Sequence, residues 1–198
     1  MPARIRLLFP SYNETHSIYG MVLMKRSISL WQLTGFAVTS LSGTLLHFLY
    51  EWTGQSTWAA PFSGVNESTW EHMKLLYFPM FIYGLIQGRY FRDRKDFWCV
   101  KLIGMAVGLT TIPVLFYTYN GAFGKSPDWI NIAIFFIAAA IAYLLENHLY
   151  NIRIIRCGRS TLAFVTMCLI GMCFIVFTFA PPHIPLFMDP LSGAYGIQ

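Results

Sequence analysis

The sequence predicts an all-α, polytopic membrane protein whose five transmembrane helices form one bundle. The first observation is a set of long stretches without Lys, Arg, Asp or Glu: residues 27–46, 75–88, 102–124, 129–145 and 161–182. Four of them approach or exceed the ~20 residues that a helix needs to cross the hydrocarbon core. The second stretch reaches that length if its helix begins near Trp70.

The second observation is the placement of the basic residues. All 14 Lys and Arg residues except Lys74 and Lys125 lie before the first stretch, between the second and third, or between the fourth and fifth. Cytoplasmic loops carry an excess of Lys and Arg, so this pattern predicts the N-terminus inside and the C-terminus outside. Lys101 is counted here as part of the second basic loop.

The third observation is composition: 198 residues, 56% hydrophobic and 12% charged, leave no room for a separate soluble catalytic domain. The net charge of +5 is explained by the basic loops, so nucleic acid is excluded as a partner. We expect a mobile N-terminal segment over 1–26, the bundle over 27–182, and a proline-rich external tail over 183–198 that folds back over the mouth of the bundle.

The four cysteines predict no disulfide. Cys99 and Cys157 fall on the predicted cytoplasmic side, while Cys168 and Cys173 lie inside the fifth helix. Their spacing also matches no zinc or redox motif.

The first helix, expected over about Ser29 to Trp52, carries a polar stripe. Steps of four, three and four residues place Ser40, Thr44, His47 and Glu51 on one face, which should look into the bundle. His47 and Glu51 can share a ligand or a proton. The alternative is a histidine at the membrane interface with one hydrogen bond to Glu51.

A second polar group opens the second helix. Ser68 and Glu71 have the spacing of a capping box. Residues 66–74 also hold two carboxylates, an imidazole and an ammonium group, which is denser than capping requires. The alternative is a solvated helix end with an ion pair between Glu71 and Lys74.

If the first two helices are antiparallel neighbours, these groups share one depth at the external end. Two histidines and two carboxylates could then bind zinc or another divalent metal with an open position for water. The candidate site residues are His47 and His72 as metal ligands, Glu51 and Glu71 as catalytic groups, and Asn66, Glu67, Lys74 and Asp189 as ligand-binding groups.

Two further features concern packing. Gly84-x-x-x-Gly88 and Gly104-x-x-x-Gly108 predict close packing of the second helix on the third, or a homo-oligomer face. Glu146, near the inner end of the fourth helix, is expected to be neutralised by Arg153 or Arg156 or to reach water.

The segments 46–54, 65–74 and 184–197 resemble an uncharacterised family of small bacterial multi-pass proteins, a domain of unknown function found mainly in Firmicutes. The resemblance covers about Met24 to Ile197 and implies a bacterial inner-membrane location. A weaker resemblance links Asn66-Glu67-Ser68 and Trp70-x-His72 to the progestin and adipoQ receptor and haemolysin III superfamily, which holds a membrane-embedded zinc. This chain lacks that superfamily's seven spans and its closing His-x-x-x-His.

The expected function is binding or handling of a small or lipid-like ligand in an outer-leaflet polar pocket formed by the first two helices. One alternative is a metal-dependent membrane hydrolase, in which Glu51 or Glu71 activates water on a metal held by His47 and His72. Another is an accessory subunit of a membrane complex. Membrane lipids are expected partners in each case.

Overall fold

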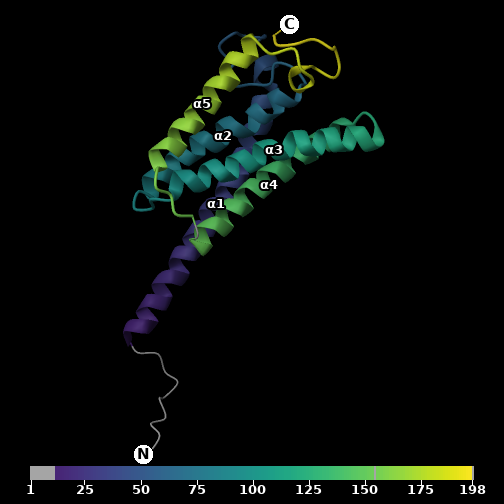
Figure 1. Cartoon of the computed structure of the whole chain (residues 1–198). Helices are drawn as coiled ribbons and strands as arrows, with labels where there is room; N and C mark the ends of the chain where they lie inside the picture. Colours follow the sequence, from purple (N-terminus) through teal and green to yellow (C-terminus); the bar gives the residue numbers. More distant parts are fainter. Residues whose placement is uncertain (1–11, 154, 198) are drawn as a thin grey trace, which may run out of the picture.

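The computed structural model describes residues 12–153 and 155–197, which form an all-helical bundle (Figure 1). Its elements are α1 (Tyr12–Trp52), α2 (Thr69–Tyr90), α3 (Phe97–Phe123), α4 (Asp128–Ile152), α5 (Ser160–Phe179) and the short 3₁₀-helix η1 (Pro185–Phe187). No strand occurs in the part of the chain that the structure describes, where Met188 and Tyr195 make one isolated antiparallel bridge. The predicted all-α class is therefore confirmed.

Among the residues that the structure describes, four helices are long and apolar enough to cross a membrane. These candidate spans are Arg26–Trp52, Phe97–Phe123, Asp128–Ile152 and Ser160–Phe179. The chain is thus a helical protein with several candidate membrane spans, as its hydropathy predicts.

Helix α2 does not reach the same hydropathy because it carries Glu71, His72, Lys74 and Gln87. It nevertheless packs against α1, α3, α4, α5 and η1. Leu76 and Met80 on this helix are completely buried, and so are Lys74 and Gln87. Helix α2 is therefore the central helix of the bundle, and its polar groups contact protein.

Helix α1 is longer than predicted. It begins at Tyr12 and runs without interruption to Trp52, so it extends past the other helices at its N-terminal end (Figure 1). Of the segment 1–26 that we expected to be mobile, residues 1–11 lie outside the described residues. Residues 12–26 continue α1 as regular helix.

All four glycines of the two Gly-x-x-x-Gly motifs pack against other helices of the same chain. A Cβ atom at Gly88 would lie 3.0 Å from the Trp98 ring of α3, so α2 and α3 approach closely there, as predicted. Gly104 faces α4, and Gly108 lies between α4 and α2, where its Cβ atom would be 3.0 Å from Ala142 and 3.2 Å from Leu76. The homo-oligomer remains a prediction.

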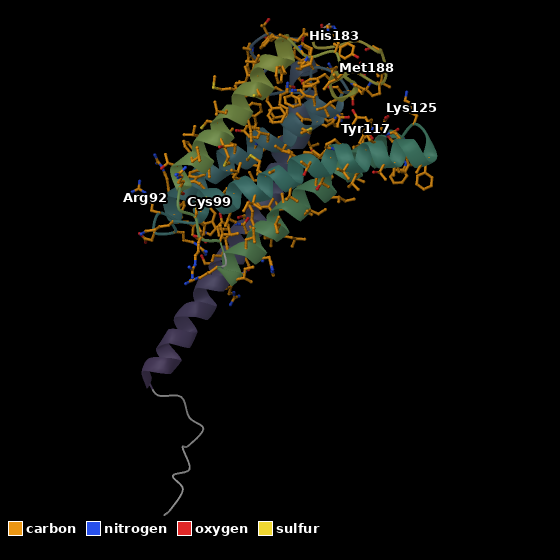
Figure 2. All side chains as sticks on the ribbon, viewed as in Figure 1. Arg92, Cys99, Tyr117, Lys125, His183 and Met188 are labelled. Atoms are coloured by element: carbon orange, nitrogen blue, oxygen red, sulfur yellow. A yellow bond between two sulfur atoms is a disulfide. The ribbon has the colours of Figure 1, made fainter. Side chains whose placement is uncertain are left out.

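The bundle has two chemically different ends. We call the end that holds the N-terminus of α2 and the C-terminal tail the pocket end. The opposite end, with the α2–α3 and α4–α5 connections, is the basic end. Figure 2 shows Arg92 and Cys99 at the basic end, and Lys125, His183 and Met188 towards the pocket end.

The prediction of four free thiols is wrong. Cys99 in the first turn of α3 and Cys157 in the α4–α5 connection form a disulfide, with Cα atoms 6.1 Å apart. Cys168 and Cys173 are free. The charge pattern assigns both residues to the cytoplasmic side, where disulfides are rare, but the bundle brings these residues together although they are 58 positions apart.

The predicted partners of Glu146 are also wrong. Its carboxylate accepts a hydrogen bond of 2.8 Å from the ammonium group of Lys101, and both side chains are fully buried. Lys101 therefore belongs to the interior of α3, not to the basic loop to which the charge pattern assigned it.

Candidate functional site

A cavity of about 480 Å³ lies at the pocket end. Its apolar wall includes Phe48 of α1, Phe116 of α3, and Ile132, Phe135 and Phe136 of α4. The α1 and α2 sides contribute the polar residues Thr44, His47, Glu67 and His72. The last turn of α3, the α3–α4 connection and the first turn of α4 contribute Asn120, Lys125, Ser126, Asp128 and Asn131. Four helices and the tail thus build a pocket that the sequence analysis assigned to two helices.

Glu67 is the centre of the polar side. His47 Nε2 lies 3.6 Å from Glu67 Oε1, and His72 Nε2 lies 3.5 Å from Glu67 Oε2. The two imidazole rings are 5.6 Å apart, centre to centre. These distances exceed those of direct hydrogen bonds. Each imidazole therefore faces one carboxylate oxygen at a distance slightly longer than a hydrogen bond.

The orientation of His72 is set by the backbone of its own helix. Its Nδ1 lies 2.9 Å from the carbonyl oxygen of Ser68, one turn earlier. A carbonyl oxygen only accepts, so Nδ1 carries a proton and donates it. In the neutral imidazole, Nε2 then presents a lone pair to Glu67. Neither this Nε2 atom nor the Glu67 carboxylate then carries a hydrogen-bond donor, so a donor must come from a second proton on His72 or from a ligand.

The first turn of α2 is capped as predicted, but only in part. Ser68 is the N-cap, and its hydroxyl accepts from the Glu71 amide at 3.4 Å. The return bond of a capping box is absent, because the Ser68 amide donates to the Asn66 side chain at 2.9 Å. The Glu71 carboxylate accepts from the Val65 amide instead, at 3.1 Å.

Glu71 and Lys74 lie away from the pocket, inside the bundle. Lys74 Nζ lies 2.5 Å from Glu71 and also donates to the Ala60 carbonyl and the Thr178 hydroxyl, at 2.8 and 2.9 Å. Neither side chain is more than 3% exposed. This pair ties α2 to the loop after α1 and to α5, which is a structural role.

The remaining predicted site residues are separated from the trio of Glu67, His47 and His72. Glu51 is exposed at the end of α1 and does not pair with His47. Asn66 donates to the Gly196 carbonyl in the tail, at 2.9 Å. The two histidines of the predicted cluster do lie together. The carboxylate beside them is that of Glu67, and not those of Glu51 and Glu71.

The tail covers part of the pocket through a turn built on Asp189. The Asp189 carboxylate accepts from the Leu191 amide at 2.9 Å and from the Ser192 hydroxyl at 2.6 Å. This turn places Pro190 and Leu191 in the pocket wall. Asp189 is thus a buried turn former and not a pocket ligand.

The polar wall on the α3–α4 side was not predicted from the sequence. Asn120 accepts from the Ser126 amide at 2.7 Å, and the Ser126 hydroxyl bonds to the Asn131 side chain at 2.8 Å. These bonds make the connection rigid where it faces the pocket. The signal was the density of polar residues over 120–131, between two apolar helices.

The predicted metal ligands lie side by side, but they are not part of a complete metal site. Within residues 12–153 and 155–197, no group of three or more His, Cys, Asp and Glu side chains is arranged to hold a metal ion. What the trio can do directly is accept hydrogen bonds, exchange a proton and attract positive charge.

Comparison with known proteins identifies a family but no activity. A family model described as "Family of unknown function (DUF6512)" matches residues 21–197. No curated protein and no solved structure matches the chain. Since the match covers nearly all of the helical bundle and the tail, this chain belongs to the DUF6512 family.

Proposed function

We propose that this protein binds an amphipathic, lipid-like ligand in the pocket, with the ligand's polar head against Glu67. The observation that carries the proposal is a partly exposed carboxylate, 41% accessible, held between two imidazoles at one side of a largely apolar cavity. Pockets for small molecules have this composition, with few polar groups that fix orientation.

The hydrogen-bonding character of the trio favours a head group with O–H or N–H donors. An ionised carboxylate only accepts, and the Nε2 atom of neutral His72 also accepts because Nδ1 is used by Ser68. Asp128 adds a second carboxylate to the wall. A hydroxyl-rich or amine head group satisfies these acceptors.

The apolar wall favours a hydrocarbon portion. Phe48 of α1 and Ile132 and Phe136 of α4 line the pocket and are also 41%, 58% and 38% exposed. All three belong to candidate membrane spans. The pocket wall is therefore continuous with protein surface that faces lipid. The hydrocarbon portion of a ligand can enter the pocket directly from the bilayer.

The proposal includes the membrane arrangement. α2 is the fifth transmembrane helix, because its polar residues are buried among the other helices. The N-terminus lies inside and the C-terminus outside, which places the pocket in the outer leaflet of a bacterial plasma membrane. Cysteine-accessibility labelling at Trp58 and Arg92, each changed to Cys in a variant without native cysteines, tests this orientation.

The ligand is tested by extracting lipids from the purified protein and quantifying them by mass spectrometry. We expect one amphiphile at close to one molecule per protein. Glu67→Gln keeps the size of the side chain but removes its charge, and should lower the retained amount about tenfold, equivalent to ~1.4 kcal/mol. Glu51→Gln is the matched control and should retain the wild-type amount.

A second variant tests whether the amphiphile occupies the pocket without changing the charge of Glu67. Thr44 is exposed and lines the cavity, so Thr44→Trp fills the pocket without removing a bond of the trio. We expect loss of the same amphiphile. Equal lipid content in wild type, Glu67→Gln and Thr44→Trp would contradict the proposal.

The metal-dependent hydrolase is a second candidate, favoured by one observation: both histidines direct Nε2 at the same carboxylate. It predicts near-stoichiometric zinc, iron or manganese that is lost in His47→Ala and His72→Ala. Elemental analysis decides between the candidates. Protein that carries neither metal nor amphiphile but copurifies with a partner would support the accessory-subunit alternative.

A further inference from the structure

Two Lys–Glu pairs are buried in the bundle, and they differ in how completely their atoms are bonded. Lys74 has three acceptors: Glu71, the Ala60 carbonyl and the Thr178 hydroxyl. An ammonium group has three N–H donors, so every donor of Lys74 is used. The Lys74–Glu71 pair therefore holds α2 to its neighbours, and none of the Lys74 donors is left for a ligand.

The second pair is incomplete. Lys101 Nζ donates to Glu146 Oε2 at 2.8 Å, and both side chains are 0% exposed. Among the described residues, this is the one hydrogen bond that either side chain makes, and Glu146 Oε1 has no partner. Buried charges and unpaired polar atoms cost free energy, most of all inside a membrane.

Helix α1 brings further unpaired atoms to the same level. Ser29 bonds to Asn147 at 3.1 Å, and Gly35 lies against the ring of Tyr143. Gln32 sits between these two contacts and so lies at the level of the ion pair. Its side chain is 3% exposed, and neither its amide oxygen nor its amide nitrogen has a partner in the described structure.

Helix α2 contributes a fourth side chain. Gly84 packs on Lys101, where an added Cβ atom would lie 3.2 Å from the lysine Cε. Gln87, one turn further along α2, is fully buried. Its Nε2 reaches the Trp31 carbonyl at 3.4 Å, while its Oε1 has no partner in the described structure.

We propose that these side chains form a hydrated proton-binding site between four helices, at which Glu146 takes up and releases one proton. We call Gln32, Gln87, Lys101 and Glu146 the four-helix polar cluster. Each helix from α1 to α4 supplies one member. Buried water typically makes about three hydrogen bonds to such otherwise unpaired polar atoms.

Glu146 exchanges its proton with water, and no other reactant is needed. In the proton-free state, the Glu146 carboxylate faces the Lys101 ammonium group. A hydronium ion transfers its proton to Oε1, which forms an O–H bond and leaves neutral water, while Oε2 still accepts from Lys101. On release, the O–H bond breaks and its proton returns to water. Acceptor oxygens of Gln32 and Gln87 can hold the water that bonds to the new O–H.

The cluster suits a proton better than a metal cation, because it offers one carboxylate, already paired with Lys101, where a metal cation needs several oxygen or nitrogen ligands. On α1, the cluster member Gln32 is neutral, and the neutral Thr39 bonds to the Tyr143 hydroxyl at 2.7 Å. The titratable and charged groups around Glu146 are Tyr83 on α2, Lys101 on α3, Tyr143 and Tyr150 on α4, and the Arg94–Asp96 pair beyond Tyr150.

Infrared difference spectroscopy of the protein in lipid bilayers, recorded across a pH titration, tests the site. We expect a carbonyl band of a protonated carboxyl group that appears on acidification and shifts in D₂O. Glu146→Gln should lose this band. Glu71→Gln removes a second buried carboxyl group and should keep this band.

Two further variants make the outcome decisive. Glu146→Asp retains a carboxyl group and should move the band, which tests the assignment if Glu146→Gln does not fold. Gln87→Leu should shift the midpoint of the titration, because it removes an acceptor from the water cluster. A band that is absent throughout the pH range of the folded protein, or that persists unchanged in Glu146→Gln or Glu146→Asp, would overturn the proposal. An unshifted midpoint in Gln87→Leu would remove α2 from the site and so overturn the four-helix cluster.

Discussion

Gly104 of α3 lies directly against the side chain of Glu146 on α4, so closely that a Cβ atom at position 104 would overlap the glutamate. The contact involves the Cγ atom and the carboxyl group. The neighbouring Lys101 approaches the same carboxylate at 2.8 Å. A small-residue motif in α3 therefore makes room for a buried ion pair.

Gly104→Ala is expected to destabilise the bundle by about 1–3 kcal/mol, the usual cost of overpacking a close contact. The new methyl group must displace Glu146 or separate α3 from α4. Denaturant unfolding in detergent measures the difference. Gly121→Ala, in the same helix with nothing within 4 Å of its Cβ position, is the control. It should be neutral or stabilising by up to about 1 kcal/mol.

Lys74→Met is expected to destabilise the protein by about 3–5 kcal/mol, because it leaves the buried Glu71 carboxylate without its cation. The double variant Lys74→Met/Glu71→Gln should recover part of this loss. A double-mutant cycle on unfolding free energies measures the coupling. Lys125→Met, at an exposed position, should change stability by no more than about 0.5 kcal/mol. Additive effects of the two buried changes would contradict the pair.

Asn66→Ala is expected to loosen the tail, because it removes the hydrogen bond from the Asn66 side chain to the Gly196 carbonyl. A bond of this kind contributes about 1 kcal/mol, so exchange of the amides over 188–197 should accelerate about fivefold. Hydrogen exchange with mass spectrometry measures the rate. Asn151→Ala, at the basic end, should leave these amides unchanged.

Thiol labelling should distinguish two classes of cysteine. Cys168 and Cys173 are free, whereas Cys99 and Cys157 form the disulfide. Alkylation of the denatured protein without reductant should modify the first two, and alkylation after reduction should modify all four. Peptide mapping identifies the sites. Complete labelling without reductant would show that the disulfide does not form in the cell.

Local sequence patterns predicted the helices well, because each backbone hydrogen bond of a helix joins residues that are four positions apart. The length and apolar character of residues 129–145 were enough to predict α4, which the structure has over Asp128–Ile152. Ser68 was predicted as a cap from spacing alone, since capping involves neighbouring residues. The start of α1 at Tyr12 was missed, because a polar stretch can extend a helix that is already formed.

The candidate site was only partly predictable. Helical spacing and antiparallel packing were enough to bring His47 of α1 and His72 of α2 together. Which carboxylate joins them depends on the path of the loop between α1 and α2. That loop turns Glu67 toward the histidines, while Glu71 bonds inward to Lys74.

The all-helical class, the apolar spans and the face of α1 that carries His47 follow from the amino-acid sequence, because they depend on composition and on a period of 3.6 residues. The pairing of Glu146 with Lys101, 45 positions earlier, and of Cys99 with Cys157, 58 positions later, depends on how the helices pack. Charge near a helix end looks the same in sequence whether it faces water or protein. Its partner is chosen by how α3 packs on α4, and no local pattern encodes that contact.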